Sequence, residues 1–236
     1  MKRLILSLAA ITCLVGNGRP AQASIILAEP PNIGAGNSWP AAGTSQRWQQ
    51  VYSNSFFGST PVQINSFSFF DVSSGSTTYG AFTVTLSTTT AAPGSLSTTY
   101  AANVGGNAAL DFSGPMTLSD VAGLTTVTLS TPFLYDPTQG NLLIDITHGA
   151  GTNFSGFLDF SSYNRSPTGL QRIANVPNSP TGVNWGFGEL PTQFEVSAQQ
   201  VPEPATITLL TSGFFAFGGF GLVRRRRGAS ESSPAC

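Results

Sequence analysis

Short runs of alternating apolar and polar residues recur through the body of this chain and limit what it can fold into. In residues 82–87, Phe, Val and Leu alternate with Thr and Ser, and Leu142, Ile144 and Ile146 again fall at every second position, with Leu143 as the one apolar exception. Side chains that alternate in this way point to opposite faces of a β-strand. No stretch of the body keeps a helical period for three turns. The pattern therefore predicts an all-β fold.

Clusters of Gly, Pro, Asn and Ser separate the strand candidates, as in residues 58–61 and 136–140. Short strands at this spacing predict an antiparallel β-sandwich or barrel. The other strand candidates are residues 51–57, 62–70, 127–129, 133–135, 157–160, 171–174 and 194–196.

Two segments have compositions of their own. Residues 24–45 are rich in Pro, Gly and Asn and predict an irregular lead-in, so that the first strand begins with residues 46–52. Residues 73–99 hold 15 Ser or Thr among 27 residues. They predict a strand, an exposed loop and a strand, with O-glycosylation as the alternative that such a composition sometimes indicates.

The N-terminus has the features of a secretory signal peptide. Lys2 and Arg3 precede an apolar stretch, residues 4–15, that is shorter than a typical membrane-spanning helix. Ala21 and Ala23 form a small-x-small cleavage site, and we expect the cut after Ala23.

The C-terminus combines a Pro-rich triplet, an apolar segment and a basic cluster. Residues 205–223 are 19 residues without a charge, and as a helix they would span about 28 Å, close to the thickness of the hydrocarbon core. The positive-inside tendency keeps the following arginines in the cytoplasm, so the body lies outside. The triplet stays extended, because proline cannot continue a helix and restrains the residue before it. The motif is Val201, Pro202, Glu203 and Pro204, and the basic cluster is Arg224, Arg225, Arg226 and Arg227.

In order and spacing, residues 201–227 resemble the PEP-CTERM sorting signal of bacterial exported proteins. The resemblance implies recognition by an exosortase-type membrane transpeptidase, removal of the span, and transfer of the body to the cell envelope or outside. Family members often occur in bacteria that make exopolysaccharide, which is therefore a candidate partner. This organisation divides the chain into a signal peptide (1–23), a β domain (24–200), a sorting signal (201–227) and a short cytoplasmic tail (228–236).

Short stretches of the body are also similar to bodies attached to other members of this exported group, and the similarity implies a jelly-roll or lectin-like sandwich without an assigned chemistry. The stretches are residues 47–52, 96–99, 132–137 and 140–145.

Removal of both ends changes the character of the chain. Residues 24–200 contain no Cys and no Lys, and three arginines against nine acids give them a net charge of −6. A domain without disulfides must be held together by its core. An acidic body without a basic patch also argues against nucleic acid and anionic lipid as partners.

Residues suited to catalysis are scarce in the body. His148 is the only histidine, and no Gly-x-Ser-x-Gly elbow accompanies it, so a histidine at a strand end is the simpler interpretation. One His and no Cys cannot supply a zinc site of His and Cys ligands. Paired carboxylates could support glycoside cleavage, although an acid in a strand most simply marks a solvent-facing position. The carboxylates available are Asp145, Asp159, Glu189 and Glu195.

Two kinds of binding site remain open. Calcium takes oxygen ligands, and its candidates are Asp71, Asp136 and Asp159, although Asp at a turn usually bonds nearby backbone. Exposed aromatic rings suit sugars, and the candidates are Trp39 and Trp185, whereas Trp48 is expected in the core.

The reading that fits these observations best is an exported, exosortase-processed protein of the cell envelope or extracellular matrix with a structural or adhesive role and no enzymatic activity. The alternatives are a carbohydrate-binding module for exopolysaccharide and a carbohydrate-active enzyme. An exposed row of aromatic side chains would favour the carbohydrate-binding module. Two carboxylates that face each other in a cleft would favour the enzyme. A smooth polar surface would favour the matrix role.

Overall fold

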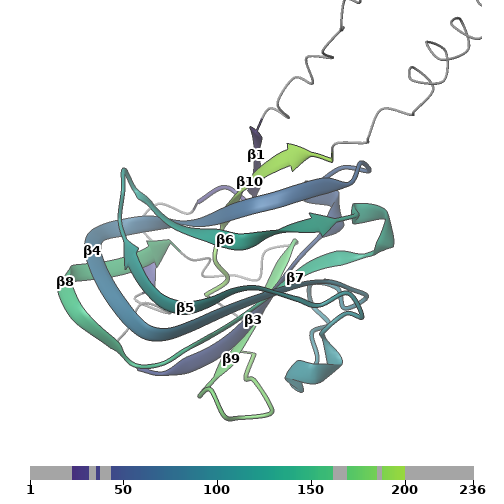
Figure 1. Ribbon diagram of the computed structural model, residues 1–236. Coiled ribbons are helices and arrows are strands. Elements are labelled where there is room, and N and C mark those ends of the chain that lie inside the picture. The colour runs from purple at the N-terminus through teal and green to yellow at the C-terminus, as the bar shows by residue number, and fades with distance from the viewer. Residues whose placement is uncertain (1–22, 32–35, 38–43, 162–168, 185–187, 200–236) are drawn as a thin grey trace, which may run out of the picture. The chain divides into compact units, whose positions relative to one another are not determined.

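The computed structural model describes residues 23–31, 36–37, 44–161, 169–184 and 188–199 (Figure 1). These residues form antiparallel strands and three single-turn 3-10 helices, and the fold class is all-β as predicted. The elements are β1 (Ala23–Ala28), β2 (Gly36–Asn37), β3 (Gln46–Tyr52), η1 (Asn54–Phe56), β4 (Val62–Thr89), η2 (Tyr100–Ala102), β5 (Ala109–Ser119), β6 (Leu124–Tyr135), η3 (Pro137–Gln139), β7 (Asn141–His148), β8 (Gly151–Ser161), β9 (Leu170–Asn175) and β10 (Thr192–Ala198).

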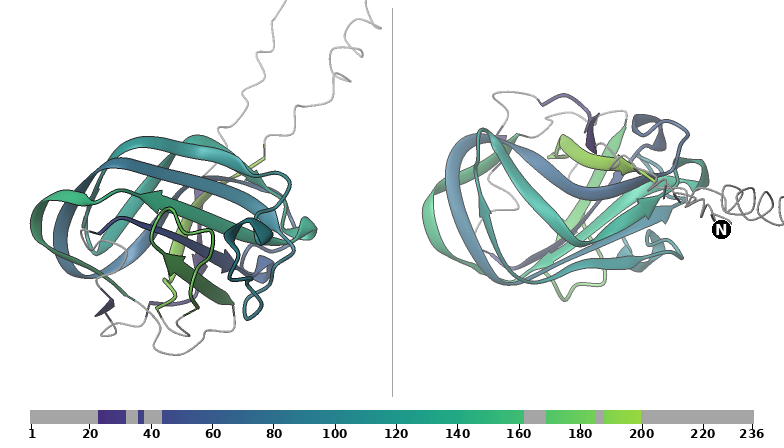
Figure 2. Two further views of the ribbon diagram at one scale, coloured as in Figure 1. Left: turned by 90° about the horizontal axis from the view of Figure 1, so that it is seen from below. Right: turned by 45° about the horizontal axis from the view of Figure 1, so that its top comes forward.

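One long strand, β4, organises the whole sheet. Its residues 62–70 lie between β10 and β6, residues 71–79 pair with β8, and residues 82–89 pair with β7. On the opposite side from β8 and β7, residues 76–86 pair with β5. Figure 2 shows β4 curving as it passes from one set of neighbours to the next. The register shifts against β5 between Tyr79 and Phe82, and a bulge of this kind bends a strand.

The curl divides the sheet into two halves. The first half-sheet consists of β1, β10, residues 62–70 of β4, and β6; the second consists of β9, β3, β7, residues 82–89 of β4, and β5. Their inner faces share one core, in which the Trp48 and Phe69 rings lie 5.7 Å apart and the Tyr52 and Phe194 rings 5.0 Å apart, centroid to centroid. The described strands thus belong to one compact unit, which ends at Gln199.

The alternation read from the sequence matches the faces of the strands. Val84, Leu86, Ile144 and Ile146 are fully buried in the shared core, and Trp48 is buried there as expected. Leu143, the exception to the pattern, points to the outer face, where it packs in a second, smaller cluster. The sequence exception therefore marks a part of the outer face that is covered.

Three strand predictions were wrong. The lead-in contains β1 and β2, because pairing with β10 makes a strand of residues 23–28 although they show no alternation. No strand covers the candidate at 51–57, because β3, which confirms the strand expected at 46–52, ends at Tyr52 before the helical turn η1. Residues 73–89 continue β4 without a loop, since β8 and then β7 pair with them on one side and β5 pairs with residues 76–86 on the other.

Among the described residues, no helix reaches the length and hydropathy that a membrane span needs. The predicted signal-peptide stretch and the predicted span at residues 205–223 lie outside the described residues.

Candidate functional site

The most organised group of polar side chains lies on the outer face of the second half-sheet, under a segment that we call the cover segment (residues 90–108). The cover segment joins β4 to β5 and contains η2. Its Leu96 and Tyr100 pack against Val51, Leu143 and Ile173, one residue from each of β3, β7 and β9. These contacts hold the cover segment against the sheet.

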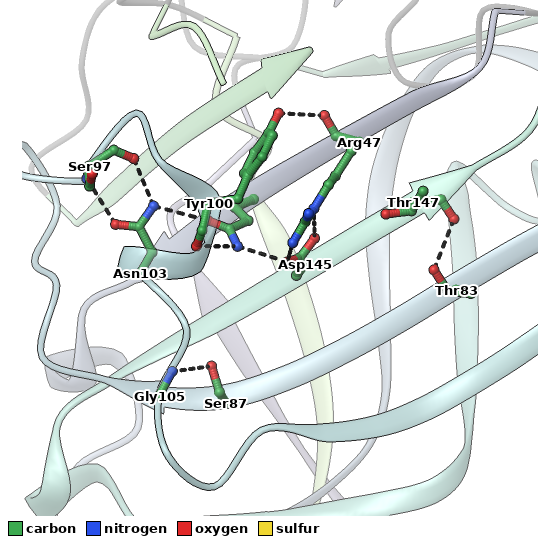
Figure 3. A network of polar contacts seen from close by, with 10 residues as sticks. Arg47, Thr83, Ser87, Ser97, Tyr100, Asn103, Gly105, Asp145 and Thr147 are labelled. Atoms are coloured by element: carbon green, nitrogen blue, oxygen red, sulfur yellow. Dashed lines mark hydrogen bonds and ion pairs between the residues drawn. The ribbon is translucent and has the colours of Figure 1, made fainter. Parts of the chain in front are cut away.

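An ion pair lies at the centre of this group (Figure 3). Arg47 donates from Nε and Nη2 to the two carboxylate oxygens of Asp145, over 3.1 and 2.6 Å. The guanidinium carbon of Arg47 also lies 4.5 Å from the ring centroid of Tyr100, and the Tyr100 hydroxyl donates to the carbonyl oxygen of Arg47. The register of β3 and β7 places Gln49 opposite Asp145 and Arg47 diagonally across from it, on the same face, so the long Arg47 side chain can reach the carboxylate.

Gln49 and Asn103 link the ion pair to the cover segment. Gln49 Nε2 donates to Asp145 Oδ2 over 2.7 Å and to the Tyr100 carbonyl oxygen over 3.1 Å. Asn103 Nδ2 donates to Gln49 Oε1, and the Asn103 side chain both donates to and accepts from the backbone of Ser97 (Figure 3). Gln49 and Asn103 are buried, so these bonds replace those that water would make.

The electrostatics of the ion pair favour its charged form. The hydrogen bond to Asp145 raises the pKa of Arg47, against the lowering effect of its partial burial. Most polar atoms of the group are hydrogen-bonded to one another. The arrangement can therefore hold the cover segment against the sheet.

A second polar group is buried between the half-sheets. Gln50 exchanges two hydrogen bonds with the backbone of Leu190 and donates to the hydroxyl of Tyr52, which pairs with Thr192 Oγ1 over 2.8 Å. Burial lowers the pKa of the nearby Arg172 to about 10 and raises that of Glu189, while the two charges attract each other. Arg172 therefore keeps its charge at neutral pH inside the core.

His148 lies on the inner face, away from Asp145 on the same strand. Its ring stacks on Phe82 at an interplanar angle of 14° and contacts Tyr79, and its Nδ1 donates to the carbonyl oxygen of Gly149 over 2.9 Å. Burial lowers the pKa of His148, so the ring is neutral at pH 7. Asp145 and His148 point to opposite faces of β7 and do not form an acid–histidine pair.

An interacting pair of carboxyl groups, Asp71 and Asp120, lies beside the turn that joins β5 and β6. Asp71 accepts from Thr125 Oγ1 over 2.9 Å, and Asp120 accepts from Ser74 Oγ and from the Gly123 amide. Burial raises the pKa of Asp71 to about 7, with a further contribution from Asp120, whereas hydrogen bonds, that of Ser74 first, lower the pKa of Asp120.

The carboxylates named as candidates for glycoside cleavage lie in separate places. Asp145 is under the cover segment, Glu189 is in the interior, and Glu195 is on the outer face of the first half-sheet, where it accepts from Ser66 Oγ. Asp159 lies in β8, with its backbone opposite Ser73.

The calcium candidates are not gathered into one site. Asp136 begins η3 and accepts from Thr138, which is the turn-capping role expected of Asp. Asp71 lies inside β4 and not at a strand end. Tyr135, the neighbour of Asp136, pairs with Val62 of β4, and Asp71 is about nine residues, or roughly 30 Å, farther along that strand. No group of three or more His, Cys, Asp or Glu side chains that could hold a metal ion occurs among the described residues.

Asp111 corrects the expectation that acids in strands face solvent. The β4–β5 register shifts between Val84 and Thr85, which leaves Asp111 at the bulge. There its carboxylate is buried and accepts the Leu86 amide over 2.8 Å. The Asp111 carboxylate thus gives the Leu86 amide a hydrogen-bond partner at the bulge. Burial raises the pKa of Asp111 to about 6.

The remaining candidates depend on the ends and on two loops. Trp39, Trp185, Ala21, the motif of residues 201–204 and the arginines of residues 224–227 lie outside the described residues. Ala23 is the first residue of β1 and is exposed. Every Trp, Tyr and Phe whose burial the structure describes is at least partly buried, so no exposed aromatic row occurs among them.

The sequence did not single out Gln49, Gln50 or Asn103 as functional residues. Gln49 and Gln50 are adjacent in a strand candidate. Because both side chains are polar, the sequence does not show which of the two faces the core. The apolar Leu143 was the available signal, because an apolar residue on the outer face implies that something covers it. A scan of protein-family models and a search of curated proteins gave no match to this chain.

Proposed function

We propose that the chain is the precursor of an exported cell-envelope or extracellular-matrix protein with a structural or adhesive role. An exosortase-type membrane transpeptidase removes its C-terminal span, and the β domain is the working part. We also propose that its curled sheet is a sandwich of the jelly-roll or lectin-like kind.

The observation that supports this proposal most is where the β domain begins and ends. Ala23, the residue before the predicted signal cut, is the first residue of β1, and β10 ends at Ala198, three residues before the sorting motif. The core that the described residues form is built from residues between the two expected processing signals. Removal of both ends would therefore leave the domain complete.

Polar contacts on the outer face of the first half-sheet favour a matrix role over the alternatives. There Ser68 bonds with Thr126 over 2.8 Å, and Ser66 bonds with Glu195 over 2.9 Å, so polar groups of neighbouring strands satisfy one another. The aromatic side chains whose burial the structure describes are all at least partly buried, so none of them is a fully exposed ring that could stack on a sugar.

Processing tests the proposal in a bacterial host that has such a transpeptidase. We expect the normal chain to give a mature form that starts at Ser24 and lacks residues 205–223. Substitution of the triplet by Pro202→Ala, Glu203→Ala and Pro204→Ala should leave the protein in the membrane at the mass of residues 24–236, with the C-terminal span still attached. Glu231→Ala, which changes another acid of the C-terminal region, is the matched control. Normal maturation of the triplet variant would refute the sorting proposal.

A glycan-binding screen on residues 24–200, with and without calcium, separates the matrix role from a carbohydrate-binding module. We expect no binding that depends on Trp39 or Trp185. Binding that is lost on Trp39→Ala or Trp185→Ala would replace the matrix role by the carbohydrate-binding one.

A further inference from the structure

Strand β1 ends the first half-sheet, and its far edge has no partner among the described residues. On its near side β1 pairs with β10 over all six residues, from Ala23 opposite Ser197 to Ala28 opposite Thr192. No strand of the described part of the chain pairs with the backbone N–H and C=O groups on that side, and such an edge can accept a further strand.

The strand lacks the features that usually protect such an edge. It contains no charge, no proline and no bulge, and Ile25 and Leu27 point outward with 57% and 45% of their surface exposed. Protected edges carry lysine, proline or a bulge that prevents a second chain from pairing. β1 instead offers an apolar row beside an open backbone edge.

We propose that β1 is a self-association edge, where a second copy of this chain adds its own β1 antiparallel to the first. The proposal rests on the proposed function in one respect, the expected cut after Ala23. That cut leaves residues 24–28 in the strand, and Glu29, with a φ of 65°, ends it. A two-fold axis through Ile26 then pairs these five residues with themselves.

The side-chain faces agree with this register. Ile25 lies opposite Leu27 of the other copy on the outer face, and Ile26 lies opposite its own equivalent on the inner face. A shift by one residue would pair an outward-facing residue with an inward-facing one. Directly paired residues of neighbouring strands have their side chains on the same face of the sheet, so this register does not occur. The strand is therefore complementary to itself in the register that its length imposes.

The charge of the domain directs association to this edge. A net side-chain charge of −6 makes two copies repel each other, and the side chains of the five edge residues carry no charge. Glu195, opposite Ile25 on β10, is the nearest acid across the sheet. Three strand spacings, roughly 14 Å, would separate the two copies of Glu195, which exceeds the screening length of about 8 Å at physiological salt.

A contact of one short strand is small and is expected to be weak in dilute solution. Copies held close together on a cell surface or in a matrix experience a high effective concentration, at which weak pairing is sufficient. Self-association therefore fits a structural role.

Cross-linking tests the register directly, since residues 24–200 contain no cysteine. Ile25→Cys and Leu27→Cys are prepared as separate proteins and mixed under mild oxidation. Residues 25 and 27 of opposing copies have Cα atoms about 4.5–5.5 Å apart, whereas two copies of residue 25 are diagonal, about 7–8 Å apart and beyond the usual reach of a disulfide. We expect several-fold more disulfide dimer from the mixture than from either protein alone. Equal yields in all three samples would overturn the register.

Sedimentation of purified residues 24–199 tests the association itself. We expect the average mass to rise toward that of a dimer with concentration, and Ile25→Lys with Leu27→Lys to keep it at the monomer value. Leu110→Lys, at an exposed site on β5, is the control that should behave like the unsubstituted domain. A monomer at every concentration, or a dimer unaffected by the β1 substitutions, would overturn the proposal. The transpeptidase takes no part in this assay, so a failure here is distinct from a failure of sorting.

Discussion

Two carboxyl groups of the domain, the half-buried Asp71 and the buried Asp111, have pKa values raised well above the usual range. Burial raises the pKa of Asp71 to about 7 and that of Asp111 to about 6, whereas an ordinary Asp has a value of 3.8. Between about pH 4 and pH 7 the native state therefore binds more protons at Asp71 than the unfolded chain does. Its contribution to stability is greatest below about pH 4 and decreases as the pH rises through 7.

The substitution Asp71→Asn should reveal this contribution. Asparagine keeps an acceptor for Thr125 and remains neutral at every pH, so we expect the variant to gain in melting temperature relative to the unsubstituted domain as the pH rises from 4 to 8. Thermal unfolding followed by circular dichroism across this range measures the difference.

Asp136→Asn is the matched control, since hydrogen bonds from Thr138 lower the pKa of Asp136. Its charged form stabilises the fold, so this variant should lose stability relative to the unsubstituted domain above about pH 4 and recover below it. The same trend in both variants would contradict the assignment of Asp71.

Residues such as Asp111 and Asn103 mark the limit of prediction at this scale. The sequence places Asp111 in a strand, where the common position of an acid is the solvent face. Its burial depends on a bulge in the pairing of two strands, and its partner, Leu86, is 25 residues away. The partners of Asn103 likewise come from Ser97 and from Gln49 on another strand. Such bonds are set by the tertiary arrangement, which local patterns do not contain.

Among the elements, strands with a clear alternation could be predicted, as β7 and the second half of β4 were. The full length of β4 could not, because residues 73–78 are mostly Ser and Thr and carry no apolar period. Pairing with β5 and β8 makes these residues a strand. β1 was missed for the same reason, since six residues without alternation become a strand only beside β10.

The cover segment crosses close to the backbone of β4, and Gly105 permits the approach. An alanine Cβ at position 105 would lie 1.7 Å from the carbonyl oxygen of Thr88, a backbone atom that cannot move without shifting the strand. We expect Gly105→Ala to lower the free energy of unfolding by more than about 2 kcal/mol, as strained core substitutions do. Urea unfolding of the purified domain measures the loss.

The neighbouring Gly106 supplies the control. No atom lies within 4 Å of an added Cβ there, so Gly106→Ala should change stability by no more than about 0.5 kcal/mol. Equal effects at the two positions would show that the close approach of Gly105 to Thr88 is unimportant.

For the whole molecule, the described core predicts where the domain can be cut. Residues 24–199 should unfold cooperatively at the same temperature as residues 24–204. Residues 24–191, which lack β10, should show no cooperative transition, because Phe194 and Val196 fill the core and β10 pairs with both β1 and β4. Near-ultraviolet circular dichroism follows the melting. A stable fold without β10 would refute the role assigned to that strand.

The side-by-side position of the first and last strands determines how the domain responds to mechanical tension. A pull between Ser24 and Val196, which lie opposite each other, acts at one end of the β1–β10 pair, so the hydrogen bonds open one after another and β1 peels away at low force. A pull along β10 against a distant part of the domain loads its bonds to β1 and β4 together in shear. A domain tethered through its C-terminus would therefore resist tension from its surroundings, and would yield readily only to a load between its own two ends.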